Sequence, residues 1–225
     1  MARLPRLAVA GQAHLALMLG HSAQPVFTDD TDRQQFLAAL RESALQHSVA
    51  VHAYALLPTE VLLLLTPGAA PALGSLMQGL GRRYGAAFNR RHGRRGSLWA
   101  GRFRTAVVQA GPTLLEAMLY VDLQGQRGGA ADLPWCSLGH HLGQRRDPLL
   151  TDSSAWWALG NTPFEREAAY RHAVADGLAP ERAAALADAA HKGWALGDAA
   201  FLAALAQQAD RPVQPRPRGR PPRPA

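Results

Sequence analysis

The stretch VAVHAYALLPTEVLLLL, residues 49–65, decides the fold. Residues 49–57 alternate over much of their length and begin with β-branched side chains, which predicts a strand. Pro58 and Thr59 then turn the chain into VLLLL, a run without a polar side chain that is typical of a central, buried strand. Glu60 places a carboxylate at the entrance of this second strand. Its role depends on the segments on either side.

In the flanking segments the spacing of apolar residues alternates between a period of two, typical of strands, and a period of 3.6, typical of helices. Asp29 or Asp30 is the expected N-cap of the first helix, and Pro112 lies in the first turn of the last one. Ala100 and Gly101 are the expected turn of a hairpin. The predicted order is a strand at 13–20, a helix at 27–48, strands at 49–57 and 61–65, a helix at 70–93, a hairpin at 96–109 and a helix from 111 to about 124.

This β-α-β-β-α-β-α order predicts an α+β protein of the ferredoxin-like, split βαβ kind, an antiparallel-rich sheet with helices on one face. We assign this domain to residues 11–127. Residues 128–208 are Ala-rich and predict a helical C-terminal extension. Residues 209–225 are expected to be a disordered cationic tail, because RPVQPRPRGRPPRPA has six prolines and five arginines and cannot form a core.

Composition limits the class of protein. The chain has 225 residues, a net charge of +7 and a single cysteine, Cys136, which excludes an intramolecular disulfide. No apolar run approaches the ~18 residues that cross a bilayer, and no signal peptide is recognisable. We therefore expect a cytoplasmic, nucleoid-associated protein that does not contact a membrane.

The basic residues are concentrated in one window. No Asp or Glu lies between Glu60 and Glu116, whereas eight arginines lie between positions 82 and 104. Arginine forms bidentate contacts with phosphates, and interleaved aromatic rings can stack on unpaired bases. Phe88 is expected in the core, whereas Trp99 is expected to stack on bases. The window predicts nucleic-acid binding through Arg82, Arg83, Arg90, Arg91, Arg94, Arg95, Trp99, Arg102 and Arg104.

The sequence FNRRHGRRGSLWAGRFR, residues 88–104, resembles the central motif of the REP-associated tyrosine transposases, single-tyrosine members of the HUH nuclease superfamily. The resemblance extends to HAYALLPTE (52–60), LLEAMLYVDLQ (114–124) and WWALGNTPFEREAAYRHAVADGL (156–178). It covers nearly the whole chain. The resemblance implies that the protein is bacterial and that its partner is single-stranded or hairpin DNA. It also allows a homodimer.

The resemblance also implies a mechanism. In that family two histidines on the central strand hold Mg²⁺ or Mn²⁺, and a helical tyrosine attacks a DNA phosphate to form a 5′-phosphotyrosine linkage during nicking and joining. Tyr120 matches the nucleophile, and Gln124 matches the amide that completes the metal shell. Their i,i+4 spacing places both on one helix face.

This chain departs from the family at the metal strand. Glu60 and Leu62 stand where the family has its two histidines. A carboxylate suits Mg²⁺ but leucine offers no ligand, so the sequence predicts an impaired metal site, with Mg²⁺ or Mn²⁺ as the cofactor if the protein is active and otherwise none. His14 or His52 could approach Glu60 instead, although we favour local hydrogen bonds or DNA contact for His14. His140 and His141 carry no spacing argument.

Three functions remain open from the sequence. One is strand nicking and joining through Tyr120, and another is DNA binding without catalysis. The third is RNA binding through the same arginines and aromatic rings. Arg218 and Arg220, within the sequence Arg-Gly-Arg-Pro, resemble an AT-hook and are expected to contact DNA as well.

Overall fold

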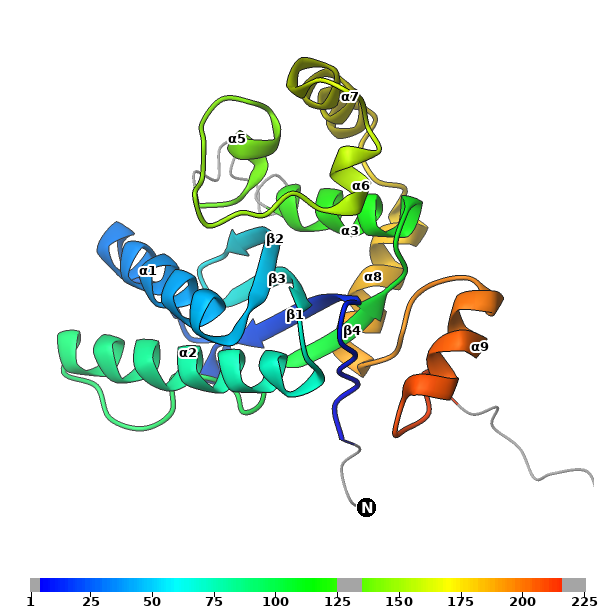
Figure 1. Ribbon diagram of the computed structural model, residues 1–225. Coiled ribbons are helices and arrows are strands. Elements are labelled where there is room, and N and C mark those ends of the chain that lie inside the picture. The colour runs from blue at the N-terminus through cyan, green and yellow to red at the C-terminus, as the bar shows by residue number, and fades with distance from the viewer. Residues whose placement is uncertain (1–4, 125–134, 216–225) are drawn as a thin grey trace, which may run out of the picture.

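The computed structural model describes residues 5–124 and 135–215, and it contains one four-stranded sheet in that part of the chain (Figure 1). The strand order is β2-β3-β1-β4, and every neighbouring pair is antiparallel. With the helices between the strands, this confirms the predicted α+β, ferredoxin-like fold. The strands are β1 (Ala13–Leu19), β2 (Val49–Leu56), β3 (Glu60–Pro67) and β4 (Arg104–Val108).

Helices cover both faces of the sheet (Figure 1). Two long helices, α1 (Asp30–His47) and α2 (Ala70–Arg91), lie on one face. The other face carries α3, so the expectation of helices on one face was wrong. The C-terminal helices add to this second layer because their apolar side chains join the same core. The helices of this layer are α3 (Pro112–Asp122), α5 (Leu138–His141), α6 (Ser154–Trp157), α7 (Pro163–Asp176) and α8 (Pro180–Lys192). The helix α9 (Ala199–Gln208) follows them in the chain.

The strand β3 serves both cores. Its side chains alternate between the faces, so Val61 and Leu63 pack under α1 and α2 whereas Leu62 and Leu64 pack under α3. All four are at most 3% exposed. The five-residue apolar run is therefore long enough to bury side chains in two layers at once, as a central strand requires.

A bulge interrupts the alternation of β2. The pairing with β3 shifts between Val51 and Ala53, which leaves His52 as the extra residue. As a result Val51 and Tyr54 point to the same face although three positions separate them. His52 bonds to Thr66 Oγ1 at 2.8 Å, which fixes its side chain beside β3.

Backbone from the C-terminal half covers both edges of the sheet. Residues 135–137 hydrogen-bond with the outer edge of β2. Beside β4, Leu196 donates to Val107 O at 2.8 Å and accepts from Gln109 N at 2.9 Å. The edge groups that these bonds reach are therefore paired within the chain.

The prediction of a hairpin at 96–109 was wrong for its first strand. Only Arg104–Val108 forms a strand, and it pairs with β1. Trp99 makes a single bridge to Gly20, and Gly96 and Gly101 adopt positive φ of 89° and 100°. Glycine adopts these angles without strain, so the segment folds back as a loop over α2.

The predicted disordered tail, residues 209–225, was placed too early in the chain. Val213 is 3% exposed and packs with Leu7 in a small cluster beside β4. Ala195 N donates to Val213 O at 2.8 Å. Residues up to 215 thus belong to the fold, as do residues before the predicted start at 11. Among the described residues, no helix combines the length and the apolar character needed to cross a bilayer.

Candidate nucleic-acid interface

A groove of about 790 Å³ runs between α2 and the loop at 96–103. Three arginines line it, namely Arg6, Arg82 and Arg102, and no Asp or Glu is among its lining residues. Amide and hydroxyl groups complete its polar surface. Those side chains are Ser75, Gln78, Asn89 and Ser97.

Four of the predicted arginines are available to a ligand. Arg82, Arg90, Arg95 and Arg102 are exposed and form no hydrogen bond or ion pair with any residue that the structure describes. Arg82 and Arg102 reach the groove from opposite walls, one on α2 and the other on the loop. Their unpaired guanidinium groups can contact the phosphates of one strand.

Other arginines of the window are paired with acids, contrary to the expectation of an uncompensated basic stripe. Arg83 bonds to Glu42 at 2.7 Å, and Arg91 bonds to Asp29 at 2.6 Å and to Asp32 at 2.5 Å. The acids come from α1 and its N-cap residue Asp29, so no local pattern in the basic window reveals them.

Two further arginines bond to side chains that are not acids. Arg94 donates to Gln24 at 2.7 Å and lies 5.5 Å from the ring centroid of Phe88. Arg104 donates to His191 Nδ1 at 2.8 Å. Both keep their positive charge, so they still add to the field at the groove and at the start of β4.

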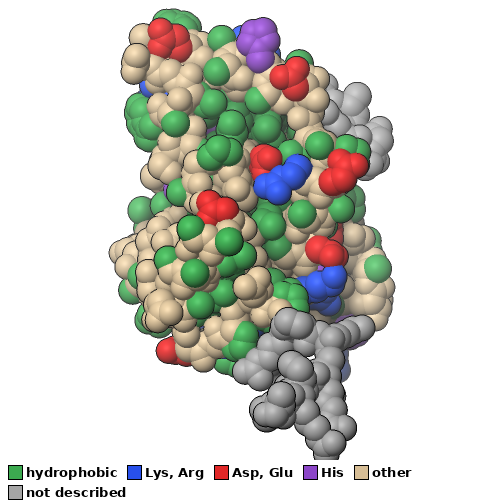
Figure 2. Space-filling model, turned by 90° about the vertical axis from the view of Figure 1, so that its right-hand side faces the viewer, with side chains coloured by type: hydrophobic (Ala, Val, Ile, Leu, Met, Phe, Trp, Pro, Cys, Tyr) green, Lys and Arg blue, Asp and Glu red, His purple; other side chains and the backbone are tan. Residues whose placement is uncertain are grey.

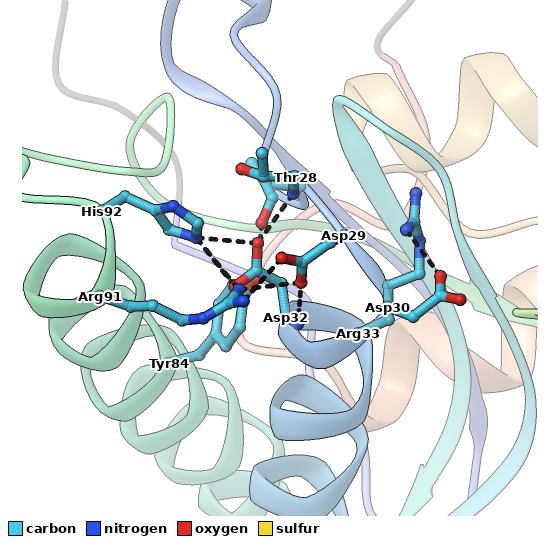
Figure 3. Close-up of polar contacts among 9 residues, drawn as sticks. Thr28, Asp29, Asp30, Asp32, Arg33, Tyr84, Arg91 and His92 are labelled. Atoms are coloured by element: carbon cyan, nitrogen blue, oxygen red, sulfur yellow. Dashed lines mark hydrogen bonds and ion pairs between the residues drawn. The ribbon is translucent and has the colours of Figure 1, made fainter.

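The pair of acids on α1 forms a clamp with the end of α2 (Figure 3). Asp29 caps α1 by accepting from Asp32 N at 3.1 Å. Asp32, whose side chain is fully buried, accepts from Arg91, from His92 Nε2 at 3.0 Å and from Thr28 N at 2.8 Å. Arg91 and His92 of the motif FNRRHG therefore join two helices.

The clamp lowers the pKa of both carboxyl groups. The hydrogen bond from Arg91 is the main reason that the pKa of Asp29 falls to about 2. Burial alone would raise the pKa of Asp32, but bonds from His92, Thr28 N and Arg91 outweigh it and hold the pKa below its ordinary value. Both acids stay ionised at neutral pH.

Trp99 was predicted to stack on bases, but most of it is buried in the core and only part of it lines the groove. Its ring is 9% exposed and packs in the core with Tyr84, and its Nε1 donates to Gly81 O at 3.2 Å. Phe88 is 2% exposed, which confirms its predicted place in the core. Phe103 is half-buried, with the guanidinium of Arg6 3.8 Å from its ring centroid.

The matched metal positions lie on the sheet face beneath α3. Leu62 is 3% exposed and belongs to the same apolar cluster as Tyr120, which is 8% exposed. Gln124 folds back and donates to Tyr120 O at 2.8 Å. Burial raises the pKa of the Glu60 carboxyl, and nearby His191 opposes that effect.

This donor set does not fit a divalent metal ion. Leu62 supplies hydrocarbon where the family has a histidine, and Glu60 is a single carboxylate. Among the described residues, His, Cys, Asp and Glu side chains form no group of three that could hold a metal. Mg²⁺ requires about six oxygen ligands, so one carboxylate and one amide leave most of the shell to water.

Neither candidate histidine replaces the missing ligand. His14 is completely buried, accepts from Val9 N through Nε2 at 3.2 Å and donates through Nδ1 to Gln12 O at 2.7 Å, as the local interpretation predicts. Burial lowers its pKa to about 4. His52 bonds to Thr66, which lies six residues beyond Glu60 and thus roughly 20 Å along the strand.

A buried polar network next to α3 was not foreseen. Asp122 accepts from His141 Nδ1 at 2.7 Å, from Tyr170 at 2.7 Å and from Ser137. All four residues are at most 2% exposed. The network fastens the end of α3 to α5 and α7. His141 therefore has a structural role, and the sequence offers no signal for it because its partner Asp122 lies 19 positions away and shares the network with Tyr170, 48 positions from Asp122.

Acidic and basic side chains are distributed differently on the side that carries α8 and α9. There they are interspersed rather than segregated (Figure 2). Arg182 bonds to Glu116 and Lys192 bonds to Asp188 at 2.6 Å. Arg218 and Arg220, predicted to contact DNA, lie outside the described residues.

Comparison with known proteins supports the fold. No family model and no curated protein sequence matches this chain. A solved structure of a REP-associated tyrosine transposase bound to a REP hairpin matches with a TM-score of 0.54 and 17% identity, over 69% of this chain and 96% of that one. A second match is a crystal structure from Deinococcus radiodurans R1 that is assigned as a transposase, with a TM-score of 0.37 and 22% identity, over 48% of this chain and 88% of that one. At this identity the first match establishes a shared fold.

Proposed function

We propose that this chain is a DNA-binding protein built on a transposase fold, and that it holds hairpin or single-stranded DNA in the groove beside α2. The groove carries the proposal because it has three arginines and no acid in its lining. Salt-dependent attraction to phosphates follows from such a surface. The similar structure was solved with a hairpin bound, which supports DNA as the ligand class.

The volume of the groove favours a single strand. Its volume of about 790 Å³ lies within the range of small-molecule sites, ~300–1,000 Å³. Arg82 and Arg102 would contact phosphates, while Gln78 presents a donor and an acceptor to the edges of unstacked bases. Since Trp99 is in the core, recognition would depend on hydrogen bonds more than on stacking.

We further propose that the protein binds DNA without metal-dependent nicking. Leu62 fills the matched ligand position with hydrocarbon, and Tyr120 packs in the same cluster. A nucleophilic tyrosine must approach the phosphate that it attacks, and a side chain 8% exposed has little room to do so. This supports the non-catalytic alternative over the inherited reaction.

The binding proposal is tested by the salt dependence of affinity for a DNA hairpin with a single-stranded extension. Wild type should lose affinity linearly on a log–log scale, with a slope of several negative units. Arg82→Gln and Arg102→Gln should each reduce the slope by about 1. Arg146→Gln, an exposed arginine outside the groove, is the matched control and should leave it unchanged. Equal slopes for all variants would contradict the proposal.

Two further measurements separate the alternatives. A matched RNA hairpin should compete weakly, and stronger competition by RNA than by DNA would identify an RNA-binding module. Incubation with DNA and Mn²⁺ should give no covalent adduct, with Tyr120→Phe as the control. An adduct that forms in wild type and not in Tyr120→Phe would show that nicking persists, without affecting the binding proposal.

A further inference from the structure

A second, smaller cavity lies at the start of β4. Its volume is about 270 Å³, and four separate parts of the chain line it: residues 5–7, 102–105, 191–193 and Arg211. It shares Arg6, Arg102 and Phe103 with the groove, so the two cavities adjoin. Most of this lining was outside the basic window that the sequence singled out.

The lining is strongly cationic. It contains five basic side chains and His191, and none of its residues, all within the described part of the chain, is acidic. Lys192 is paired with Asp188 outside the lining at 2.6 Å. His191 Nδ1 accepts from Arg104, so in the neutral ring Nε2 carries the proton and can donate. The basic side chains are Arg6, Arg102, Arg104, Lys192 and Arg211.

Two buried polar groups in this lining lack partners. Thr105 is 3% exposed and its Oγ1 forms no hydrogen bond with the described residues. Arg211 Nε is also buried without a partner, although the guanidinium donates to Gly193 O. Burial lowers the pKa of Arg211, as expected for a cation without a nearby carboxylate. Buried polar groups are rarely left unpaired unless a ligand or ion completes them.

We propose that this cavity binds a phosphate group. Phosphate oxygens would accept from the Thr105 hydroxyl, from Arg211 Nε and from Arg102, which has no partner in the described structure. The cavity is smaller than the usual range for a whole organic ligand, which favours the phosphate alone.

The phosphate can come from two sources. Because the cavity adjoins the groove, a DNA strand in the groove can place its next phosphate here, and this source rests on the proposed function. A free phosphate compound needs only the cavity. The two sources make different predictions for DNA binding, and one set of variants tests both.

The first measurement is thermal unfolding of the full chain in inorganic phosphate against chloride at equal ionic strength. Phosphate should raise Tm of wild type, because a ligand that binds only the folded state stabilises it. Thr105→Val keeps the shape and removes the hydroxyl, and it should weaken phosphate binding about tenfold, the worth of one hydrogen bond to a charged group. Arg211→Gln should abolish the rise, whereas the control Arg146→Gln should keep it.

The second measurement is the salt slope of hairpin binding by the same variants. A slope reduced by about 1 in Arg211→Gln assigns the phosphate to DNA. An unchanged slope with a retained Tm effect in wild type assigns it to a free phosphate compound. The proposal is overturned if phosphate raises Tm no more than chloride, or if Thr105→Val, folded and as stable as wild type, keeps the full rise. Arg82→Gln separates the two proposals, since it should weaken DNA binding and leave the phosphate effect intact.

Discussion

Position 62 lies on the sheet face beneath α3, and a leucine fills it. Glu60 precedes it by two residues, so both side chains point to the same face and their Cα atoms are about 7 Å apart along the strand. The period of two was readable from the sequence, and the burial of Val61 and Leu63 in the opposite core confirms it.

Replacing both residues by histidine, Glu60→His with Leu62→His, should create a metal-binding pair. Without metal the variant should be destabilised by about 1–3 kcal/mol, because an imidazole replaces a buried leucine. Mn²⁺ should then raise its Tm by binding the folded state. Glu60→His alone is the control and should respond weakly. An equal Mn²⁺ response in wild type would show that Glu60 already holds a metal.

His14 should make stability depend on pH. Its pKa is about 4 in the folded protein and 6.5 without the fold, so between these values the unfolded chain binds more protons. Stability therefore rises with pH across this window, by up to about 3 kcal/mol, since one pKa unit corresponds to about 1.4 kcal/mol. His14→Gln should remove that part of the rise in denaturant titrations from pH 4 to pH 7. Parallel profiles for both proteins would contradict this assignment.

Residue roles that depend on distant partners could not be read from the sequence. Arg91 and its partner Asp32 are 59 positions apart, and Tyr170 is 48 positions from Asp122. The composition of the basic window correctly identified a cationic segment. Which of its arginines are free was set by acids on another helix, and those partners appear only once the helices pack.

At the scale of elements, the clamp between α1 and α2 has a measurable cost when it is broken. Asp32→Asn removes a charge that is buried among Arg91, His92 and Thr28 N, so it should lower the free energy of unfolding by about 1–3 kcal/mol. Asp30→Asn changes an exposed carboxylate in the same turn and should stay within about 0.5 kcal/mol. Urea denaturation of the two variants checks the difference.

The same pair of variants has a pH signature. Because the pKa of Asp32 is lowered by folding, its contribution is present above the unfolded value of 3.8 and is lost as pH falls below it. Asp32→Asn should therefore lose less stability on acidification than wild type does. If both proteins lose the same stability on acidification, protonation of Asp32 does not weaken the clamp.

The elements whose apolar residues recur at a regular spacing could be predicted from the sequence, and the loops between them could not. The period of 3.6 in α2 and the apolar run in β3 are set by local burial. The segment at 96–103 has aromatic and apolar residues typical of a strand, yet Trp99 packs into the core and two glycines bend the backbone. Tertiary packing overrode the local preference there.

At the scale of the molecule, the C-terminal helices complete the sheet rather than form a separate appendage. Tyr170 and Leu186 are fully buried in the cluster that contains Leu62. A fragment of residues 1–124 should therefore expose that face, unfold without a cooperative transition and bind a dye such as ANS. A chain ending at residue 215 keeps these contacts and is the control. A sharp transition in the fragment at the Tm of the full chain would refute this.

The paired edges of the sheet limit how copies of the protein can associate. Continuous sheets between molecules need a free strand edge, which is also where fibrils begin. Here residues 135–137 and Leu196 occupy groups that a second copy would need. A homodimer would therefore have to form through side chains on helices or loops, or release one of these segments first. The apolar strand β3 lies between β2 and β1, so it is protected from intermolecular pairing while the folded state persists.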